Sequence, residues 1–415
     1  MTKNRLLYSL IIIYKEAINI FMNTKEKEYT IIGVDGGGSK VSSGIIESNN
    51  TTNFTITSLS HHYYNEISEF NSIFSPVDMD TQLNEYNKEQ YNINDDEIVQ
   101  GNTIIESFYN SIINLNIEKP ILIGVGMVGL KTNDSRGIGA IANGPRMPKF
   151  CIQLENLLKK SDIHLYTPIK YIGSDADNCG VGEEYGNNGL FNGIQNGYYI
   201  GGGTGTADAL KLENKLIPFD NISSWMVKTW EIVNENNISM EKFTSLQGIQ
   251  SLYSYYSKTS INTLQDKSIY ANEIFTRALE NDQAALLTCE DITKYISTLI
   301  VERIETIFSG WQNKFQLLNP KHRFLDNNHP YKNNLLERII IGQGLGKLFH
   351  LSKNTPLLWD PLHNNIYNMI KKSNVLPLEI KNHLFENNGL KKDFIMTSNL
   401  DNSALLGAGI SAIYH

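Results

Sequence analysis

The chain has 415 residues, of which 41% are hydrophobic and 19% are charged. This length and composition predict a globular protein with room for two domains, and they exclude a disordered or fibrous chain. The formal net charge of −8 argues against nucleic acid as the main partner, because phosphate backbones select basic surfaces. Three cysteines, Cys151, Cys179 and Cys289, lie far apart without CxxC spacing, which fits a reducing compartment and argues against a structural zinc site.

A short apolar run, Leu6 to Tyr14, lies near the start of the chain. The run is too short to span a bilayer, and charged residues follow it with no small-residue cleavage pattern. A secretion signal, a short helix packed on the body and an upstream start before a native Met22 are the three interpretations, and we favour the last two. We therefore expect an N-terminal extension over residues 1–23, a cytoplasmic protein and no membrane partner.

The first predicted elements form an antiparallel β-meander. The apolar run Tyr29 to Val34 ends on a glycine cluster, and Val41 to Glu47 and Asn53 to Ser58 continue as strands. Residues 59–96 show no helical period and predict a long connection, which is either functional or mobile. The segments after it alternate between helix and strand around a loop at 141–149: helix 97–114, strand 120–125, helix 150–160, strand 169–173, helix 175–185 and strand 197–201.

The pattern changes to long helices between residues 240 and 311, for example Ala284 to Ile307. Strands are predicted again at Arg338 to Ile341 and at Phe394 to Thr397, before a last helix from Asn402 to Ile413. The recurrence of strands, helix and strand predicts two lobes of similar α/β build.

The first motif that carries chemistry directly follows a strand and consists of Gly36, Gly37, Gly38, Ser39 and Lys40. Bare glycine backbone approaches a phosphate closely and offers N–H donors to it. Asp35, at the end of the strand, is suited to hold Mg²⁺ through water. The next segment is β-like, which excludes a Walker loop and a Rossmann fingerprint. Taken alone, the motif is equally compatible with a plain glycine hairpin turn.

A second glycine-rich motif also follows a strand and leads into a β-like stretch, and it consists of Gly201, Gly202, Gly203, Thr204, Gly205 and Thr206. Two such hairpins can close on one polyphosphate from opposite sides, with the threonine hydroxyls as additional donors. The pair is far less probable by chance than either motif alone. Together they predict a polyphosphate ligand.

A third motif places Ser174 and Asp175 at the end of a strand and the start of a helix, where α/β folds bind ligands. In phosphoryl transfer a carboxylate can accept the proton of the attacking hydroxyl. The alternative is that either residue caps the helix, and the two roles do not exclude each other.

A fourth motif, with Gly342 and Gly344, runs from a strand into a helix. It is compatible with a nucleotide base or ribose lying against bare backbone, and equally with a tight strand-to-helix turn. The small residues between Leu405 and Gly409 favour close packing of the last helix.

These segments, in this order, resemble the sugar-kinase branch of the actin–hexokinase–heat-shock-chaperone ATPase superfamily. The closest likeness is to the ROK kinases (repressor, open reading frame, kinase), and a second is to N-acetylglucosamine kinases and their BadF-type relatives. IIGVDGGGSK is similar to the family's first phosphate loop, and YYIGGGTGTADALKLENKLI to its second. SNLDNSALLGAGISAIYH resembles the last helix.

Two further stretches carry site residues by resemblance. SDADNCGVGEE is similar to a ROK segment of the form N-D-A-N-x-A-A-x-G-E, which implies that Asp175 is the catalytic aspartate and places Glu183 at the closing glutamate. GVGMVGLKTNDSRGIGAIANGP resembles the stretch whose asparagine contacts the sugar, and Asn143 is the matching position.

The chain also departs from the family. ROK kinases carry a cysteine-rich zinc site with a histidine that touches the sugar, whereas residues 218–245 stand in its place here. Glu231 and Glu241 are candidates for the family's sugar-binding glutamate, with a surface role as the alternative. ROK repressors carry an N-terminal pair of DNA-binding helices, for which the 28 residues before the first core strand leave no room.

The resemblance implies an α/β, two-lobe actin-like ATPase (ribonuclease H-like) fold with a central cleft. The first lobe would span 24–143 and include the C-terminal helix 401–415, and the second would span 144–400. ATP would bind between the glycine hairpins with Mg²⁺ near Asp35, and Asp175 would take the proton from a hydroxyl of a hexose or N-acetylated amino sugar. A BadF-type ATPase and a non-catalytic sugar or nucleotide sensor are the alternatives, and a homodimer contact is one use for residues 59–96.

Overall fold

The computed structural model describes residues 28–48, 53–319 and 325–414, so the apolar run Leu6 to Tyr14 and the extension 1–23 lie outside the described residues. The chain divides into two compact units. The first comprises Met1–Asn187 and Asn402–His415, and the second comprises Asn188–Asp401.

The first unit is built on a five-stranded sheet of order β3-β2-β1-β4-β7. The first three strands form the expected antiparallel meander, and the last two run parallel to β1. The strands are β1 (Thr30–Gly36), β2 (Lys40–Ser48), β3 (Phe54–Tyr63), β4 (Ile121–Met127) and β7 (Ile172–Gly173).

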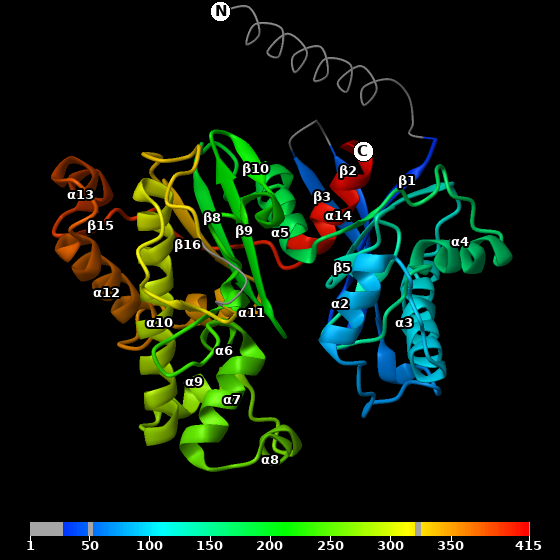
Figure 1. Cartoon of the computed structure of the whole chain (residues 1–415), viewed down its shortest axis with the longest axis horizontal. Helices are drawn as coiled ribbons and strands as arrows, with labels where there is room; N and C mark the ends of the chain where they lie inside the picture. Colours follow the sequence, from blue (N-terminus) through cyan, green and yellow to red (C-terminus); the bar gives the residue numbers. More distant parts are fainter. Residues whose placement is uncertain (1–27, 49–52, 320–324, 415) are drawn as a thin grey trace, which may run out of the picture. The chain divides into compact units, whose positions relative to one another are not determined.

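Helices cover both faces of this sheet (Figure 1). Because strand side chains alternate between faces, Ile32 and Val34 enter a core with α3 and α4, while Gly33 between them faces α14. A Cβ on Gly33 would lie 2.0 Å from the Leu405 carbonyl oxygen, so only glycine permits this approach. The helices of the unit are α2 (Met79–Lys88), α3 (Asp95–Ile113), α4 (Phe150–Lys160), α5 (Asp175–Tyr185) and α14 (Ser403–Tyr414).

The boundary between the units differs from the predicted one at 143/144. Strand β7 pairs in parallel with β4, and α5 packs on α14, so both belong to the first unit. The pairing of β7 involves two residues and a partner far away in the sequence, which hydrophobic patterning cannot detect. The first unit therefore continues to Asn187.

The segment 59–96 also differs from the prediction, because it contains the ten-residue helix α2. Asp78 caps this helix by accepting a hydrogen bond from the Thr81 N–H (2.9 Å). The one buried residue of α2 is polar, Gln82, so the helix lacks the apolar stripe by which helices are recognised in a sequence. A small hairpin of β5 (Leu130–Lys131) and β6 (Ile138–Ala140) lies against it.

The second unit repeats this sheet topology with the order β10-β9-β8-β13-β16. Its first three strands are antiparallel, and β13 and β16 continue in parallel, which confirms the prediction of two α/β units of similar build. The strands are β8 (Gly197–Gly202), β9 (Thr206–Leu212), β10 (Lys215–Ile217), β13 (Arg338–Gly342) and β16 (Ile395–Thr397).

A helical subdomain follows β10 in the second unit. Its longest member, α10 (Gln283–Ser309), buries Ile292, Ile296 and Leu299 on one face, at the spacing that defines a helix stripe. The other α-helices of the second unit are α6 (Glu241–Thr244), α7 (Leu246–Ser257), α8 (Ile261–Asp266) and α9 (Ala271–Leu279), and, after β13, α11 (Gln343–Leu351), α12 (Trp359–Lys372) and α13 (Leu378–Leu384). β11 (Ile232–Val233) and β12 (Gln316–Leu317), far apart in the sequence, form a two-stranded antiparallel sheet, and a short hairpin pairs β14 (Phe385–Glu386) with β15 (Gly389–Leu390). Within the described ranges, no helix has the length and apolar character that crossing a bilayer requires.

Candidate functional site

In the first unit, three parallel strands end at one edge of the sheet and bring two aspartates close together. Asp35 of β1 is in register with Gly126 of β4, and Gly126 is in register with Gly173 of β7. Asp175 follows two residues after Gly173, as the first residue of α5. The negative charge of Asp175 acts on Asp35 strongly enough to raise the pKa of its carboxyl. The carboxyl ends of parallel strands are where α/β folds bind ligands.

Asp35 is a carboxylate in an environment that disfavours its charge. Its pKa is raised to about 7, first by burial and then by the negative charge of Asp175, while Lys40 opposes the rise. Its Oδ1 atom is shielded from solvent and has no hydrogen-bond partner among the described residues. A shielded carboxylate oxygen without a partner is costly, and a cation bound there would offset the cost. Asp35 therefore fits the predicted role of a Mg²⁺ ligand.

The chemistry of the Asp35 side chain is compatible with Mg²⁺. This cation is commonly held by one or two carboxylates together with waters and substrate phosphates. Within residues 28–48, 53–319 and 325–414, no three His, Cys, Asp or Glu side chains form a group that could hold a metal.

The two roles considered for Ser174 and Asp175 fall on different residues. The Ser174 side chain caps α5 by accepting a hydrogen bond from the Asp177 N–H (3.4 Å). Asp175 is half-buried in the first turn, where the positive end of the helix dipole favours a carboxylate. The capping of α5 therefore does not depend on Asp175.

Asn178, to which the sequence assigned no role, is buried in the same corner. A Cβ on Gly126 would lie 2.7 Å from its Nδ2 atom and 3.4 Å from Asp35 Oδ1. The Nδ2 atom has no hydrogen-bond partner within the described part of the chain, although the Asn178 carbonyl oxygen Oδ1 accepts a bond from Ser411 Oγ (3.4 Å). The signal for Asn178 in the sequence is its place one helical turn after Asp175.

The first glycine motif forms a tight hairpin turn between β1 and β2. The Gly37 N–H donates to the Lys40 carbonyl oxygen (3.0 Å), and the Tyr64 hydroxyl donates to the Gly37 carbonyl oxygen (2.8 Å). Gly37, Gly38 and Ser39 are exposed. The hairpin shape is thus established, and phosphate binding by its backbone stays a prediction.

Asn143 lies exposed at the tip of a loop that follows β6. Ile138 and Met147 close the base of this loop through two backbone hydrogen bonds of 2.9 Å. The loop also adjoins the carboxyl end of β4, because a Cβ on Gly129 would lie 2.9 Å from the Ala140 carbonyl oxygen.

In the second unit, the second glycine motif forms the hairpin between β8 and β9. The Gly203 N–H donates to the Gly205 carbonyl oxygen (2.9 Å), and the Leu246 N–H donates to the Gly203 carbonyl oxygen (2.8 Å). A Cβ on Gly202 would lie 2.2 Å from the Thr244 carbonyl oxygen, so glycine permits the close approach of α6. The Thr206 and Thr244 hydroxyls are 2.6 Å apart.

Glu241, predicted as a sugar ligand, lies on this hairpin. Its Oε1 atom accepts a hydrogen bond from the Thr206 N–H (3.1 Å) and would be 2.9 Å from a Cβ on Gly205. The carboxylate thus faces the backbone that the sequence assigned to phosphate. Glu231, the other candidate, accepts from the Lys228 N–H (2.8 Å) as part of a short helical turn.

Gly342 and Gly344 stand beside the second hairpin, where Gln343 forms a bridge with Gly202. A Cβ on Gly342 would lie 2.2 Å from the Tyr199 hydroxyl, and one on Gly344 would lie 2.3 Å from Leu246 Cδ1. Packing therefore explains both glycines, and contact with a nucleotide stays a prediction. Gln343 itself, to which no role was assigned, has a positive φ of 55°, a strained backbone that occurs preferentially at functional sites.

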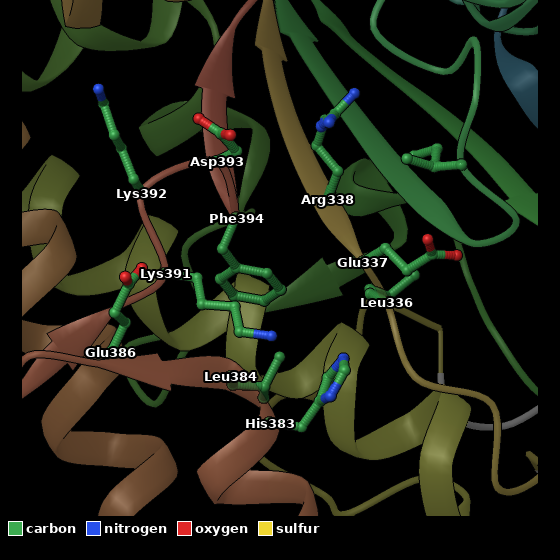
Figure 2. A pocket seen from close by; sticks show the side chains of 11 residues that line it. Leu336, Glu337, Arg338, His383, Leu384, Glu386, Lys391, Lys392, Asp393 and Phe394 are labelled. Atoms are coloured by element: carbon green, nitrogen blue, oxygen red, sulfur yellow. The ribbon is translucent and has the colours of Figure 1, made fainter.

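A cavity of about 330 Å³ lies elsewhere in the second unit (Figure 2). Glu337, Arg338 and Phe394 line it, and they stand at the amino ends of β13 and β16. The glycine hairpin follows the carboxyl end of β8, which is parallel to β13. The cavity therefore lies at the amino ends of the parallel strands, opposite to the glycine hairpin, and none of the predicted site residues lines it.

Comparison with solved structures identifies the fold. A ROK family glucokinase from Streptomyces griseus, in complex with glucose and AMPPNP, aligns with a TM-score of 0.57 at 12% identity over 93% of this chain and 100% of its own. A ROK hexokinase from Thermus thermophilus aligns at 0.52 and 12% identity over 93% and 98%.

A ROK family transcriptional regulator, a homologue of the E. coli MLC protein, aligns at 0.50 and 12% identity over 94% of this chain and 80% of its own. No family profile and no curated protein matches the sequence. The chain therefore has the α/β actin-like ATPase fold of the ROK sugar kinases and regulators.

Proposed function

We propose that the chain is an ATP-dependent sugar kinase with Asp175 as its general base. The observation that carries the proposal is the placement of Asp175 beside Asp35 at the carboxyl edge of the first sheet, next to the glycine hairpin that follows β1. The fold shared with a glucokinase that holds glucose and AMPPNP supports ATP as donor and a sugar as acceptor.

In the proposed reaction, Asp175 accepts the proton of a sugar hydroxyl as that oxygen attacks the γ-phosphorus of ATP. The bond between this phosphorus and the β,γ-bridging oxygen breaks, and ADP leaves. Phosphoryl transfer needs mainly positioning and charge stabilisation, so one well-placed carboxylate supplies the acid–base chemistry. The dipole of α5 and the cap from Ser174 hold Asp175 at the helix start, and Asn143 binds the acceptor.

In this proposal the glycine hairpin of the first unit binds phosphates of ATP through the backbone donors of Gly37, Gly38 and Ser39. In the second unit, Thr204 and Thr206 offer hydroxyl donors to a phosphate. Asp35 would hold Mg²⁺, which would supply positive charge to the transferred phosphoryl group. Lys40, whose charge already acts on Asp35, faces the same anions.

The second candidate function follows from the ROK regulator of the same fold. A sensor that binds sugar or nucleotide would not need a base at position 175, and a BadF-type ATPase would hydrolyse ATP without an acceptor. The proximity of Asp175 to Asp35 favours the kinase, because two acids held together cost stability, and carboxyl groups with raised pKa values cluster at functional sites.

The proposal is tested by a coupled ADP-release assay across hexoses and acetylated amino sugars. We expect ADP release that depends on at least one sugar, and a loss of about 10³-fold or more in kcat for Asp175→Asn. Calorimetric titration with ADP should give nearly the same affinity for both proteins. Unchanged turnover in the variant would remove Asp175 from the mechanism, and ADP release insensitive to every sugar would favour the ATPase.

A further inference from the structure

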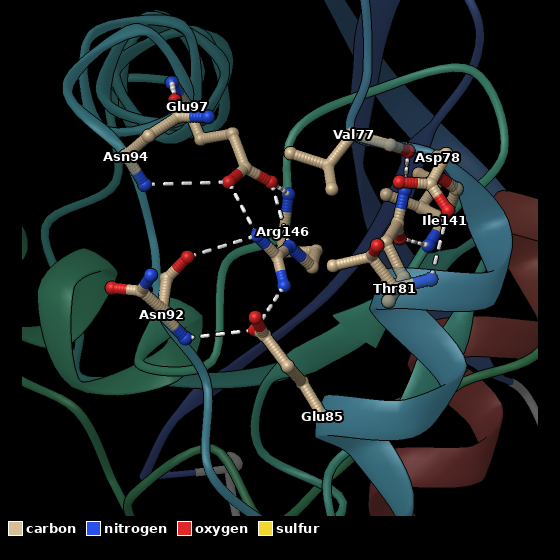
Figure 3. A network of polar contacts seen from close by, with 10 residues as sticks. Val77, Asp78, Thr81, Glu85, Asn92, Asn94, Glu97, Ile141 and Arg146 are labelled. Carbon is tan, nitrogen blue, oxygen red and sulfur yellow. Dashed lines mark hydrogen bonds and ion pairs between the residues drawn. The ribbon is translucent and has the colours of Figure 1, made fainter.

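A fully buried arginine stands at the foot of the Asn143 loop. Arg146 donates from Nε and Nη2 to the two carboxylate oxygens of Glu97 at 2.7 and 2.6 Å (Figure 3). Its Nη1 atom donates to Glu85 Oε2 at 2.5 Å, and Nη2 also donates to the Asn92 carbonyl oxygen at 3.0 Å. The guanidinium thus joins the loop to α2, to the start of α3 and to the segment between them.

A buried glutamine, Gln82, forms hydrogen bonds to the other side of the same loop. Gln82 Oε1 accepts from the Ile141 N–H at 2.8 Å, and Gln82 Nε2 donates to the Ile141 carbonyl oxygen at 3.1 Å and to the Val77 carbonyl oxygen at 2.7 Å. One side chain therefore satisfies both backbone groups of Ile141, two residues before Asn143. Its exposure is 0%, so no water competes for these bonds.

Gln82, Glu85 and Asn92 belong to the segment 59–96, for which the sequence suggested only a homodimer contact. Tyr86 of the same helix donates from its hydroxyl to the Lys131 carbonyl oxygen (3.0 Å) on the adjoining hairpin. A Cβ on Gly139 would lie 2.7 Å from the Tyr86 ring and 2.9 Å from the Tyr91 hydroxyl. Helix α2 is therefore packed along the β5–β6 hairpin that leads into the Asn143 loop, and Gln82 hydrogen-bonds to the loop itself.

We propose that α2 is a positioning element for the acceptor, and that Gln82 and Arg146 set the placement of the Asn143 loop. The inference rests on the proposed function, because Asn143 is the acceptor ligand there. Directional polar bonds suit such a role, because a fully satisfied buried network specifies one geometry, whereas its net contribution to stability is modest. Small displacements at a substrate-positioning residue have large kinetic effects.

Gln82→Met tests the inference, because methionine keeps the side-chain length and removes the donor and the acceptor. We expect KM for the phosphorylated sugar to rise about tenfold to a hundredfold, while ADP affinity and KM for ATP stay within about twofold. Amide exchange at Ile141 should accelerate, since its N–H loses its partner. This exchange readout needs no sugar.

Gln100→Met is the matched control. Gln100 is a second buried glutamine of the same unit whose side chain binds both backbone groups of one residue. It accepts from the Asn71 N–H (2.9 Å) and donates to the Asn71 carbonyl oxygen (3.3 Å). It makes the same kind of contact at a site remote from Ile141 in the sequence. We expect a comparable loss of thermal stability from both variants, with the rise in sugar KM confined to Gln82→Met.

The outcomes separate this inference from the proposed function. If Gln82→Met and Gln100→Met had the same KM for the sugar, whether unchanged or raised in both, the positioning role would be contradicted. The kinase proposal would not be affected. A wild-type protein that phosphorylates no sugar would fail the kinase proposal itself. Arg146→Lys serves as a second variant: it keeps the charge and breaks the fork to Glu97, and a sugar KM as in the wild type would likewise contradict the inference.

Discussion

At the scale of single residues, the first unit buries charge in two contrasting ways. Burial would raise the pKa of Glu97, but the hydrogen bonds and charge of Arg146 outweigh it and hold the pKa below its ordinary value. Asp35 has a shielded oxygen without a partner and a pKa raised to about 7. The charge of Glu97 is compensated within the fold by Arg146. The charge of Asp35 is not compensated and costs free energy, which a bound cation would offset.

The cost at Asp35 predicts that Asp35→Asn stabilises the metal-free protein. An unfolded carboxyl titrates near 3.8 and the folded one near 7, so ionisation favours the unfolded state between these values. The advantage of the variant should be absent below about pH 4, grow up to pH 7 and then level off at roughly 2 to 4 kcal/mol. Urea unfolding in EDTA at pH 4.5 and 7.5 measures it, and Mg²⁺-dependent turnover should be lost.

Glu97→Gln is the control of opposite sign. It makes the same change of carboxylate to amide in the same unit, but it removes the partner of a buried arginine and should cost roughly 3 kcal/mol at pH 7.5. Destabilisation by Asp35→Asn as well would mean that Asp35 is a structural residue.

Glu241 carries a second prediction at this scale. Its carboxylate accepts from the Thr206 N–H, where the proposal places phosphate, so the two anions repel each other. Glu241→Gln keeps an acceptor for this N–H and removes the charge, and ATP affinity should rise about fivefold, or roughly 1 kcal/mol. Glu231→Gln, away from the hairpin, should leave the affinity unchanged. Weaker ATP binding by Glu241→Gln in calorimetric titration would instead make Glu241 a ligand.

At the scale of elements, α14 determines where Asp175 stands. A Cβ on Gly407 of α14 would lie 1.8 Å from the Asn178 carbonyl oxygen, and one on Gly182 of α5 would lie 2.3 Å from the Ser403 carbonyl oxygen. Only glycines allow these helices to pack so closely. The small residues of the last helix thus have the packing role that the sequence predicted.

Gly407→Ala should therefore destabilise the first unit by about 1–3 kcal/mol and lower kcat, because it pushes away the helix that begins with Asp175. Helix propensity alone predicts the opposite sign, a gain of about 1 kcal/mol. Gly37→Ala is the control for stability, since its Cβ would meet the Lys40 carbonyl oxygen at an ordinary 3.4 Å. A stabilised Gly407→Ala in thermal unfolding would show that the helices can separate at no cost.

At the scale of the whole molecule, features that depend on residues close together in the sequence could be predicted, and features that depend on distant residues could not. The meander and the β13–α11 junction carry local signals, namely β-branched runs that end on glycine, and these were predicted. The closeness of Asp35 and Asp175 depends on the pairing of β7 with β4, two strands far apart in the sequence, and was not predicted.

The missed features depend on contacts between distant residues. Helix α2 is held by Gln82 rather than by apolar side chains, β7 pairs through two residues, and Glu241 reaches the glycine hairpin only in the folded chain. Composition and periodicity carry no information on such pairs.

Transfer of the γ-phosphoryl group to a sugar is the step that distinguishes a kinase from an ATPase or a sensor. The protein is incubated with γ-³²P-labelled ATP and each sugar of the panel, and the labelled products are separated. We expect label on one sugar with the wild-type protein and almost none with Asp175→Asn, although both bind ATP. Label found only in inorganic phosphate, at a rate independent of sugar and of residue 175, would contradict the kinase proposal.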